Sequence, residues 1–150
     1  MIYLHGLIIH DKHSYFDYNA IMTARDVGYP KEIKVRERIP YTNHVFDFSY
    51  LAREKIFEER TLVYELSIIE RGLRNRQKLN FRANEIVNWL RRSFGKTPVI
   101  DTYTPEYHFL AECSDVAVTY ELGVARIKAT FIASPYRIPN KPDSDLHEII

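Results

Sequence analysis

The stretch Asn75–Gly95, with the sequence NRQKLNFRANEIVNWLRRSFG, carries the strongest periodic signal in the chain. Its apolar residues recur at steps of three and four, which places them on one side of a helix. Gly95 can leave the helix in a left-handed conformation, and Pro98 blocks a restart. The pattern therefore predicts one amphipathic helix over about residues 75–94. Its apolar stripe is formed by Leu79, Ala83, Ile86, Val87, Leu90 and Phe94, with Trp89 at the edge.

The rest of the sequence alternates between polar and apolar residues, a period of two that is typical of half-buried strands. The clearest segments are 31–39, 56–70 and the two that flank the tight turn Leu122-Gly123. A helix with one apolar stripe needs a sheet to cover that stripe. We therefore expect an α+β, mainly β fold of about eight short strands, either an antiparallel β-sandwich or a partly open barrel with one packed α-helix. The residues expected to point inward are Leu62, Tyr64, Leu66, Ile68, Ala125, Ile127, Ala129 and Phe131.

The composition is that of one soluble domain. The 150 residues include 45% hydrophobic and 27% charged residues, enough apolar material for a core. We expect a single β-rich domain over residues 1–136 and a loose, proline-containing C-terminal tail over residues 137–150. Cys113 is the only cysteine, so no internal disulfide can form. The chain has neither a signal peptide nor a run of apolar residues long enough to span a bilayer, so we expect folding in the cytoplasm.

Charge is distributed unevenly along the chain. Residues 71–96 hold eight basic residues and only Glu85 as an acidic one, a net charge of +7 in a chain whose total is +1. The helix region is therefore predicted to form a basic patch on a mildly acidic body, which can meet an acidic surface of a nucleic acid or a protein. A solvated helix face remains an alternative. The patch would include Arg76, Arg91 and Arg92.

Two aromatic groups are candidates for a contact surface. Aromatic residues make up 13% of the chain, and several are clustered. Burial in the core explains such clusters as well as an exposed contact surface does, so both interpretations stay open. The first group is Tyr15, Phe16 and Tyr18, and the second is Tyr41, Phe46, Phe48 and Tyr50.

No pattern of catalytic strength occurs. The chain lacks a nucleophile elbow and a glycine-rich phosphate loop. His5, His10 and His13, with Asp11, are spaced too irregularly for a zinc site. No histidine or other base is tied to Cys113 by a motif, which favours a small core residue over a nucleophile. We therefore expect no catalytic residues, no metal, no cofactor and no enzymatic activity.

Five short pieces follow one another in fixed order over residues 1–136. They are an opening strand with Gly6, Ile39-Pro40 followed by Phe46-Asp47-Phe48-Ser49, a strand over Thr61–Glu70, the helix piece Ile86-Val87-Asn88-Trp89-Leu90, and a hairpin around Gly123 that ends in residues 129–136. Each piece alone is a loose pattern, and the resemblance rests on the order of the pieces. Together they resemble the N-terminal domain of the distal tail (Dit-like) proteins of long-tailed siphophages.

This resemblance implies a structural protein of a phage or prophage tail. The family forms hexameric rings, a hub of the tail tip or baseplate, from a β-sandwich with a helix that is related in fold to tail-tube proteins. The implied partners are other copies of the chain, the tail tube, the tape measure and the tail-tip or baseplate proteins. DNA would pass through the channel without specific binding, and no membrane is involved. The implied location is the virion tail, after assembly in the host cytoplasm.

The sequence departs from the family pattern in two places. Tyr41-Thr42-Asn43 stands where the family commonly has a glycine-rich turn, and the chain stops at Ile150, where many members continue into a galectin-like domain. Either that carbohydrate-binding surface is absent or the chain is a fragment. The second hypothesis for function is a monomeric nucleic-acid-binding module that uses the basic helix. An enzyme with an unrecognised site ranks last.

Overall fold

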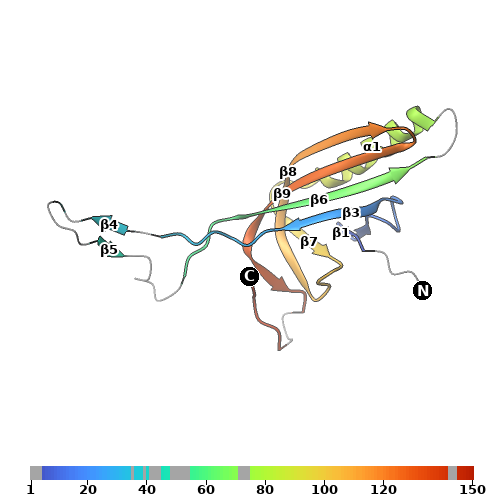
Figure 1. The fold of residues 1–150 in the computed structure, drawn as a ribbon. Coiled ribbons are helices and arrows are strands. Elements are labelled where there is room, and N and C mark those ends of the chain that lie inside the picture. The colour runs from blue at the N-terminus through green and yellow to red at the C-terminus, as the bar shows by residue number, and fades with distance from the viewer. Residues whose placement is uncertain are drawn as a thin grey trace.

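The structure is a computed structural model that describes residues 5–34, 36–38, 40, 45–47, 55–70, 75–141 and 145–150. Within these residues, seven strands form an antiparallel sheet that is not closed, in the order β2-β1-β7-β8-β9-β6-β3, while β4 pairs with β5 (Figure 1). The predicted class, α+β and mainly β, is confirmed. The elements are β1 (Leu7–Ile9), β2 (Lys12–His13), β3 (Ile21–Val27), β4 (Arg36–Arg38), β5 (Val45–Asp47), β6 (Arg60–Ile69), α1 (Asn75–Leu90), β7 (Thr97–Asp101), β8 (Tyr107–Glu121) and β9 (Val124–Pro139).

Helix α1 lies on one face of this sheet and contacts β6, β8 and β9. Four of the six residues of the predicted apolar stripe, Leu79, Ala83, Ile86 and Leu90, are buried. Each large apolar side chain buried in this way contributes about 1.5–3 kcal/mol. Opposite them, the inward rows of β6 and β9 are buried as predicted. These rows consist of Leu62, Tyr64, Leu66, Ile68, Ala125, Ile127, Ala129 and Phe131.

The helix is shorter than predicted. It ends at Leu90, and Phe94 is fully exposed in the turn that follows, so its assignment to the stripe is wrong. Strand β7 begins at Thr97, so the chain must leave the helix axis early to return to the sheet. Gly95 does have a positive φ of 78°, but it serves this turn and not the helix end itself.

Trp89, expected at the edge of the stripe, is fully buried. Its indole Nε1–H donates a hydrogen bond to the carbonyl of Ile9 over 3.0 Å, and its ring lies 4.8 Å from that of Tyr18. A buried indole needs such a partner for its N–H. Trp89 therefore joins the helix to β1 and to the turn before β3.

Strands β8 and β9 form one long hairpin, and both are longer than β6. β8 contains the segment predicted before the tight turn and extends back to Tyr107. Bulges between Phe109 and Ala111 and between Cys113 and Asp115 shift its alternation, which broke the period in the sequence. The tight turn is as predicted, with Gly123 at φ 72°.

Strand β9 continues to Pro139, three residues past the predicted domain boundary at residue 136. In the segment predicted as a loose tail, Ile149 pairs with Arg137 through two backbone hydrogen bonds. Residues 142–144 lie outside the described part of the chain. The division into a domain and a tail stays a prediction.

The segment predicted as one clear strand, residues 31–39, is more irregular. Glu32 forms a bridge with Phe57, and the strand β4 covers only Arg36–Arg38. Val35 and Ile39, two apolar residues of this segment, lie outside the described residues.

Candidate assembly surface

The four strands β3, β6, β9 and β8 form the half of the sheet that carries the helix. β7 pairs with β8 only between Phe109 and Ala111, so β8 beyond Ser114 has β9 as its one neighbour among the described strands. At the other side, β3 pairs with β6 alone. In the described part of the chain, this half of the sheet therefore ends in two unpaired edges.

Neither edge carries a proline or a lysine that would hinder pairing with another chain. Natural edge strands are often shielded by proline, lysine or very short length. β3 and the segment 114–121 of β8 contain no proline and no lysine. The protection that the edges do carry is one bulge each, between Met22 and Ala24 in β3 and between Cys113 and Asp115 where the free segment of β8 begins. Sequence reasoning missed these edges, and the missing lysines and prolines are no signal for them, because the central strand β6 lacks both as well.

The apolar residues next to the two edges are only partly buried. Those on β3 and β8 pack against the core but stay partly exposed, whereas the inward rows of β6 and β9 are closed to solvent. A partner at either edge would therefore bury apolar surface as well as pair the backbone. The half-buried residues are Met22, Val27, Val116, Val118 and Tyr120.

An ionic cluster around the buried Asp101 fixes β3 against the rest of the sheet. The Arg25 Nε–H donates to Asp101 Oδ2, and the Tyr64 hydroxyl donates to the same oxygen over 3.3 Å. The other oxygen, Oδ1, accepts the backbone N–H of Tyr103 over 2.9 Å. Burial, followed by the charge of Asp101, raises the pKa of Tyr64 far above its usual value. The cluster therefore positions an edge strand.

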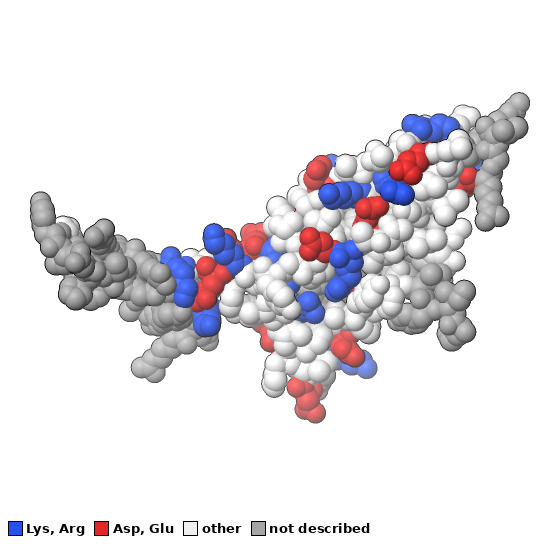
Figure 2. All heavy atoms as spheres, viewed as in Figure 1, with Lys and Arg blue, Asp and Glu red and all other residues white. Residues whose placement is uncertain are grey.

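Three of the eight basic residues of the predicted patch form ion pairs inside the chain. Arg82 and Lys78 pair with Glu70 at 2.6 Å and 3.7 Å, and Lys96 pairs with Glu59 at 3.1 Å. Basic and acidic side chains are interspersed over the face seen in Figure 2. Arg71 and Arg74 lie outside the described residues.

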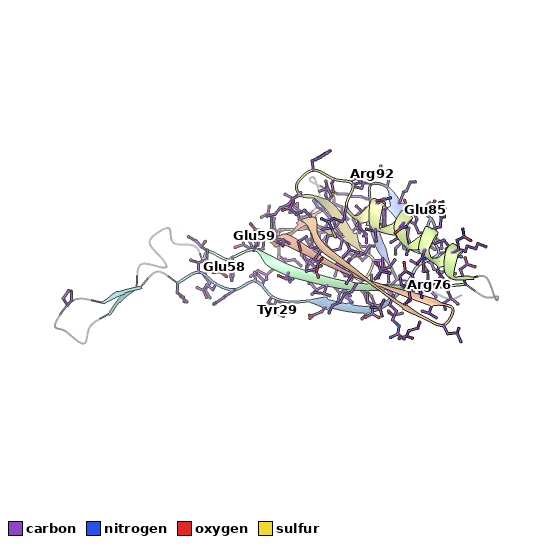
Figure 3. The ribbon with its side chains drawn as sticks, turned by 90° about the horizontal axis from the view of Figure 1, so that it is seen from above. Tyr29, Glu58, Glu59, Arg76, Glu85 and Arg92 are labelled. Atoms are coloured by element: carbon purple, nitrogen blue, oxygen red, sulfur yellow. The ribbon has the colours of Figure 1, made fainter. Side chains whose placement is uncertain are left out.

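The three arginines that the sequence singled out on the helix do not come together. Arg76 and Arg92 lie at opposite ends of α1, with Glu85 between them (Figure 3). The Arg76 guanidinium stacks on the ring of Tyr120 at 3.9 Å, whereas Arg91 and Arg92 are exposed. Arg91 and Arg92 thus form a small basic site at the C-terminal end of the helix.

The first aromatic group splits between core and surface. Tyr18 packs against Trp89 and the core, Tyr15 is half-buried, and Phe16 is 74% exposed. In the second group, Tyr41, Phe48 and Tyr50 lie outside the described residues. Phe46 lies on β5, and its side chain is not described. Among the members whose side chains are described, Phe16 is the one that is exposed.

The histidines and the cysteine have structural surroundings. His5 stacks on Tyr103 at 3.8 Å, and His13 Nδ1 accepts the N–H of Tyr15 over 3.0 Å. The described residues contain no group of three or more His, Cys, Asp or Glu arranged to hold a metal. Burial raises the pKa of the Cys113 thiol, which disfavours the nucleophilic thiolate.

The described features define a class of fold: an open antiparallel sheet covered on one face by a single helix, with two strand edges left free. This fold is similar to that of the Dit (gp 19.1) protein of phage SPP1, whose crystal structure is described as a paradigm of the hub adsorption apparatus in phages that infect Gram-positive bacteria. The TM-score is 0.70 at 10% sequence identity, over 90% of this chain and 52% of that one. The chain thus spans about half the length of the Dit protein. No family model and no curated protein matches the sequence.

The resemblance to distal tail proteins expected from the order of the sequence pieces is confirmed at the level of the fold. At 10% identity, the evidence for this similarity comes from the structure and not from the sequence. Among the described residues, no helix is both long and apolar enough to cross a membrane.

Proposed function

We propose that this chain is a structural subunit of a phage or prophage tail that assembles with copies of itself into a ring at the tail tip. The pair of unpaired edges at opposite sides of one half-sheet carries the proposal. Contact between two different surfaces of the same chain is heterologous, and such contacts close into rings when the rotation between copies fits. The similarity in fold to a phage hub protein supports this assignment.

The strand directions suit such a junction. Neighbouring strands in the series β8, β9, β6, β3 are antiparallel, so β8 and β3 run in opposite directions. Rotation about a ring axis keeps the direction of β8 in the next copy. That strand would therefore lie antiparallel to β3, and the sheet can continue from copy to copy without interruption.

Six copies, the number implied by the family, would give a closed sheet of about 24 strands. At about 4.8 Å per strand, its circumference is at least about 115 Å, which encloses a wide channel. Helix α1 occupies one face of the sheet and would lie outside the ring, which leaves the open face toward the channel. In this proposal DNA passes through without specific binding. The protein needs no cofactor and has no enzymatic activity.

The proposed ring joins the tail tube to the tip or baseplate proteins, and it also contacts the tape measure. Its place is the virion tail after assembly in the host cytoplasm.

Disulfide cross-linking between the two edges tests the ring. With Cys113→Ser as background, Ala24→Cys on β3 is combined in turn with Asp115→Cys, Ala117→Cys or Thr119→Cys on β8. All four positions are exposed. The partners of Ala24 and Ala117 across the sheet, Glu65 and Lys128, lie in the outward rows, so both new thiols lie on the open face. If the edges pair, the combination closest to register should form covalent multimers up to six chains under mild oxidation.

Each single-cysteine variant is the matched control, since one thiol per chain can link no more than two chains. Double variants that melt like the parent but cross-link no further than the single variants would contradict the ring.

A nucleic-acid-binding module remains the second hypothesis. The small basic site formed by Arg91 and Arg92 favours it, but the ion pairs of Arg82, Lys78 and Lys96 reduce the predicted basic patch.

A further inference from the structure

Two arginine side chains meet at the end of the sheet where β3 ends and β6 begins. Arg60 is the first residue of β6, and Arg137 lies directly opposite Phe109 in the pairing of β8 with β9. The Cζ atoms of the two guanidinium groups lie 5.2 Å and 5.3 Å from the centre of the Phe109 ring. An aromatic face attracts a cation, so this one buried ring holds two positive charges close to each other.

No carboxylate of the described residues forms an ion pair with either of these guanidinium groups. Asp101, the one buried carboxylate in the described part of the chain, already accepts three hydrogen bonds from other groups. Glu59 precedes Arg60 in the sequence, but its carboxylate pairs with Lys96 at 3.1 Å. The two positive charges over the ring are therefore not neutralised among the residues that the structure describes.

This arrangement is costly for Arg60. The residue is 2% exposed, and burial, followed by the charge of Arg137, lowers the pKa of its guanidinium. Its Nη1 and Nη2 atoms donate to the carbonyls of Pro135, over 3.2 Å, and Gly28, which offsets part of the cost of burying the charge. The Nε–H groups of both arginines are also buried and have no acceptor among the described residues. Each of these unpaired donors has lost the hydrogen bond that water would supply.

The two arginines differ in what explains their positions. The two carbonyl groups account for Arg60 as a structural residue that ties β6 to its neighbours. Arg137 is half-buried, and among the described residues its side chain contacts the Phe109 ring but makes no hydrogen bond or ion pair. A guanidinium group offers a planar fork of N–H donors that fits two oxygens of a carboxylate or a phosphate. The unpaired donors of Arg137 therefore suit an oxyanion.

We propose that Arg137, with the buried Arg60 beside it, binds an oxyanion, either a phosphate or a carboxylate group, at this end of the sheet. The bound anion neutralises the charge that the two guanidinium groups share. The site is independent of the proposed ring contact, because neither residue lies on β3 or on residues 114–121 of β8. Arg60 also belongs to the inward row that continues with Leu62, so the site does not lie on the open face proposed to line the channel. The phosphates of passing DNA are therefore not the expected ligand.

Nuclear magnetic resonance of inorganic phosphate tests the site, because it detects weak binding to a protein of any size. When phosphate exchanges on and off the chain, its phosphorus resonance broadens in proportion to the bound fraction. Arg137→Gln should reduce this excess broadening about tenfold, the loss expected for one charged hydrogen-bonding group. The matched control is Arg126→Gln on the same strand, where the side chain is half-exposed and pairs with Glu121 at 3.5 Å. This control should leave the broadening unchanged.

Arg137→Lys is a second variant, which keeps a positive charge over the Phe109 ring but lacks the planar fork. Its binding of phosphate should lie between that of the parent and that of Arg137→Gln. Both variants should keep the circular dichroism spectrum of the parent, since the Arg137 side chain donates no hydrogen bond to a described residue.

Competition identifies the class of ligand. Sulfate should displace phosphate and narrow the resonance again, whereas chloride at the same ionic strength should not. If acetate displaces phosphate as well as sulfate does, the site takes the carboxylate of a partner, and if sulfate alone does so, it takes a phosphate group. Equal broadening by the parent and both Arg137 variants would overturn the site. Equal losses in Arg137→Gln and Arg126→Gln, or displacement by chloride, would also overturn it.

Discussion

β9 and residues 114–121 of β8 lie side by side, yet their apolar side chains are buried to different degrees. Ile127 on β9 is completely buried, whereas Val118, directly opposite on β8, is only partly so. A helix with its side chains is about 10 Å wide, and strands are about 4.8 Å apart, so one helix covers about two strands. A four-stranded half-sheet under one helix thus leaves a strand uncovered on each side. The comparison separates the strands whose apolar side chains are buried within one chain from the edge strands, whose side chains only a partner could cover fully.

The largest effect should come from a charge under the helix. Leu90→Asp places an unpaired carboxylate at a buried position, which costs several kcal/mol and should unfold the domain. Circular dichroism and a thermal melt measure the loss. Leu122→Asp, at a fully exposed position in the β8–β9 turn, is the matched control and should melt like the parent.

The opposed pair gives the sharpest test of the comparison. In the monomer, Ile127→Ala should cost about 2–5 kcal/mol because a buried cavity forms, whereas Val118→Ala should cost about 1 kcal/mol or less. Denaturant unfolding at low protein concentration measures both. For ring assembly we expect the opposite order of effects. Val118→Ala should weaken assembly more than Ile127→Ala, because it removes apolar surface that the next copy would cover. Equal losses of stability would mean that the two strands do not differ as described.

A smaller effect is expected in the turn before β3, through His13. Burial lowers the pKa of His13, opposed by the charge of Asp17, and Nδ1 must stay unprotonated to accept the N–H of Tyr15. The unfolded chain takes up this proton below about pH 6.5. The stabilising contribution is therefore complete above that pH and is lost as the pH falls toward the lowered folded pKa.

His13→Asn keeps an acceptor in place of Nδ1 but does not titrate. Its melting temperature should fall less than that of the parent between about pH 7 and about pH 5. Parallel curves for the two proteins would exclude a contribution from His13.

The smallest effect on stability should come from the exposed arginines. Arg91→Glu with Arg92→Glu should change the free energy of unfolding by no more than about 0.5 kcal/mol, since both side chains lie off the buried stripe. The same variant tests the second hypothesis for function. If the parent binds DNA with an affinity that falls steeply with salt and the double variant does not, the basic site has a role in nucleic-acid binding.

Periodicity alone was sufficient to predict the helix, the inward rows of β6 and β9, and the class of the fold. These elements are simple because the helix lies directly over them, so each has one buried and one open face. The predictions for two large residues near the end of the helix were less accurate. Trp89 was expected at the edge of the apolar stripe and is buried, and Phe94 was expected in the stripe and is exposed. Whether a large apolar residue near a helix end is buried depends on where the next strand begins, which the helix sequence does not contain.

The candidate assembly surface could not be derived from local patterns. Edge strands and central strands alternate alike, and only the order of strands in the sheet identifies β3 and β8 as edges. The bulges of β8 add a second difficulty, because one extra residue shifts the alternation of inward and outward side chains along the strand.

The long pairing between β6 and β9 also determines how the body would carry a mechanical load. A pull on either end of β6 is directed along a strand that is paired with β9 over its entire length. The hydrogen bonds of an antiparallel ladder run perpendicular to the strands. Such a pull therefore shears the whole ladder at once, and its bonds share the force in parallel instead of opening one after another.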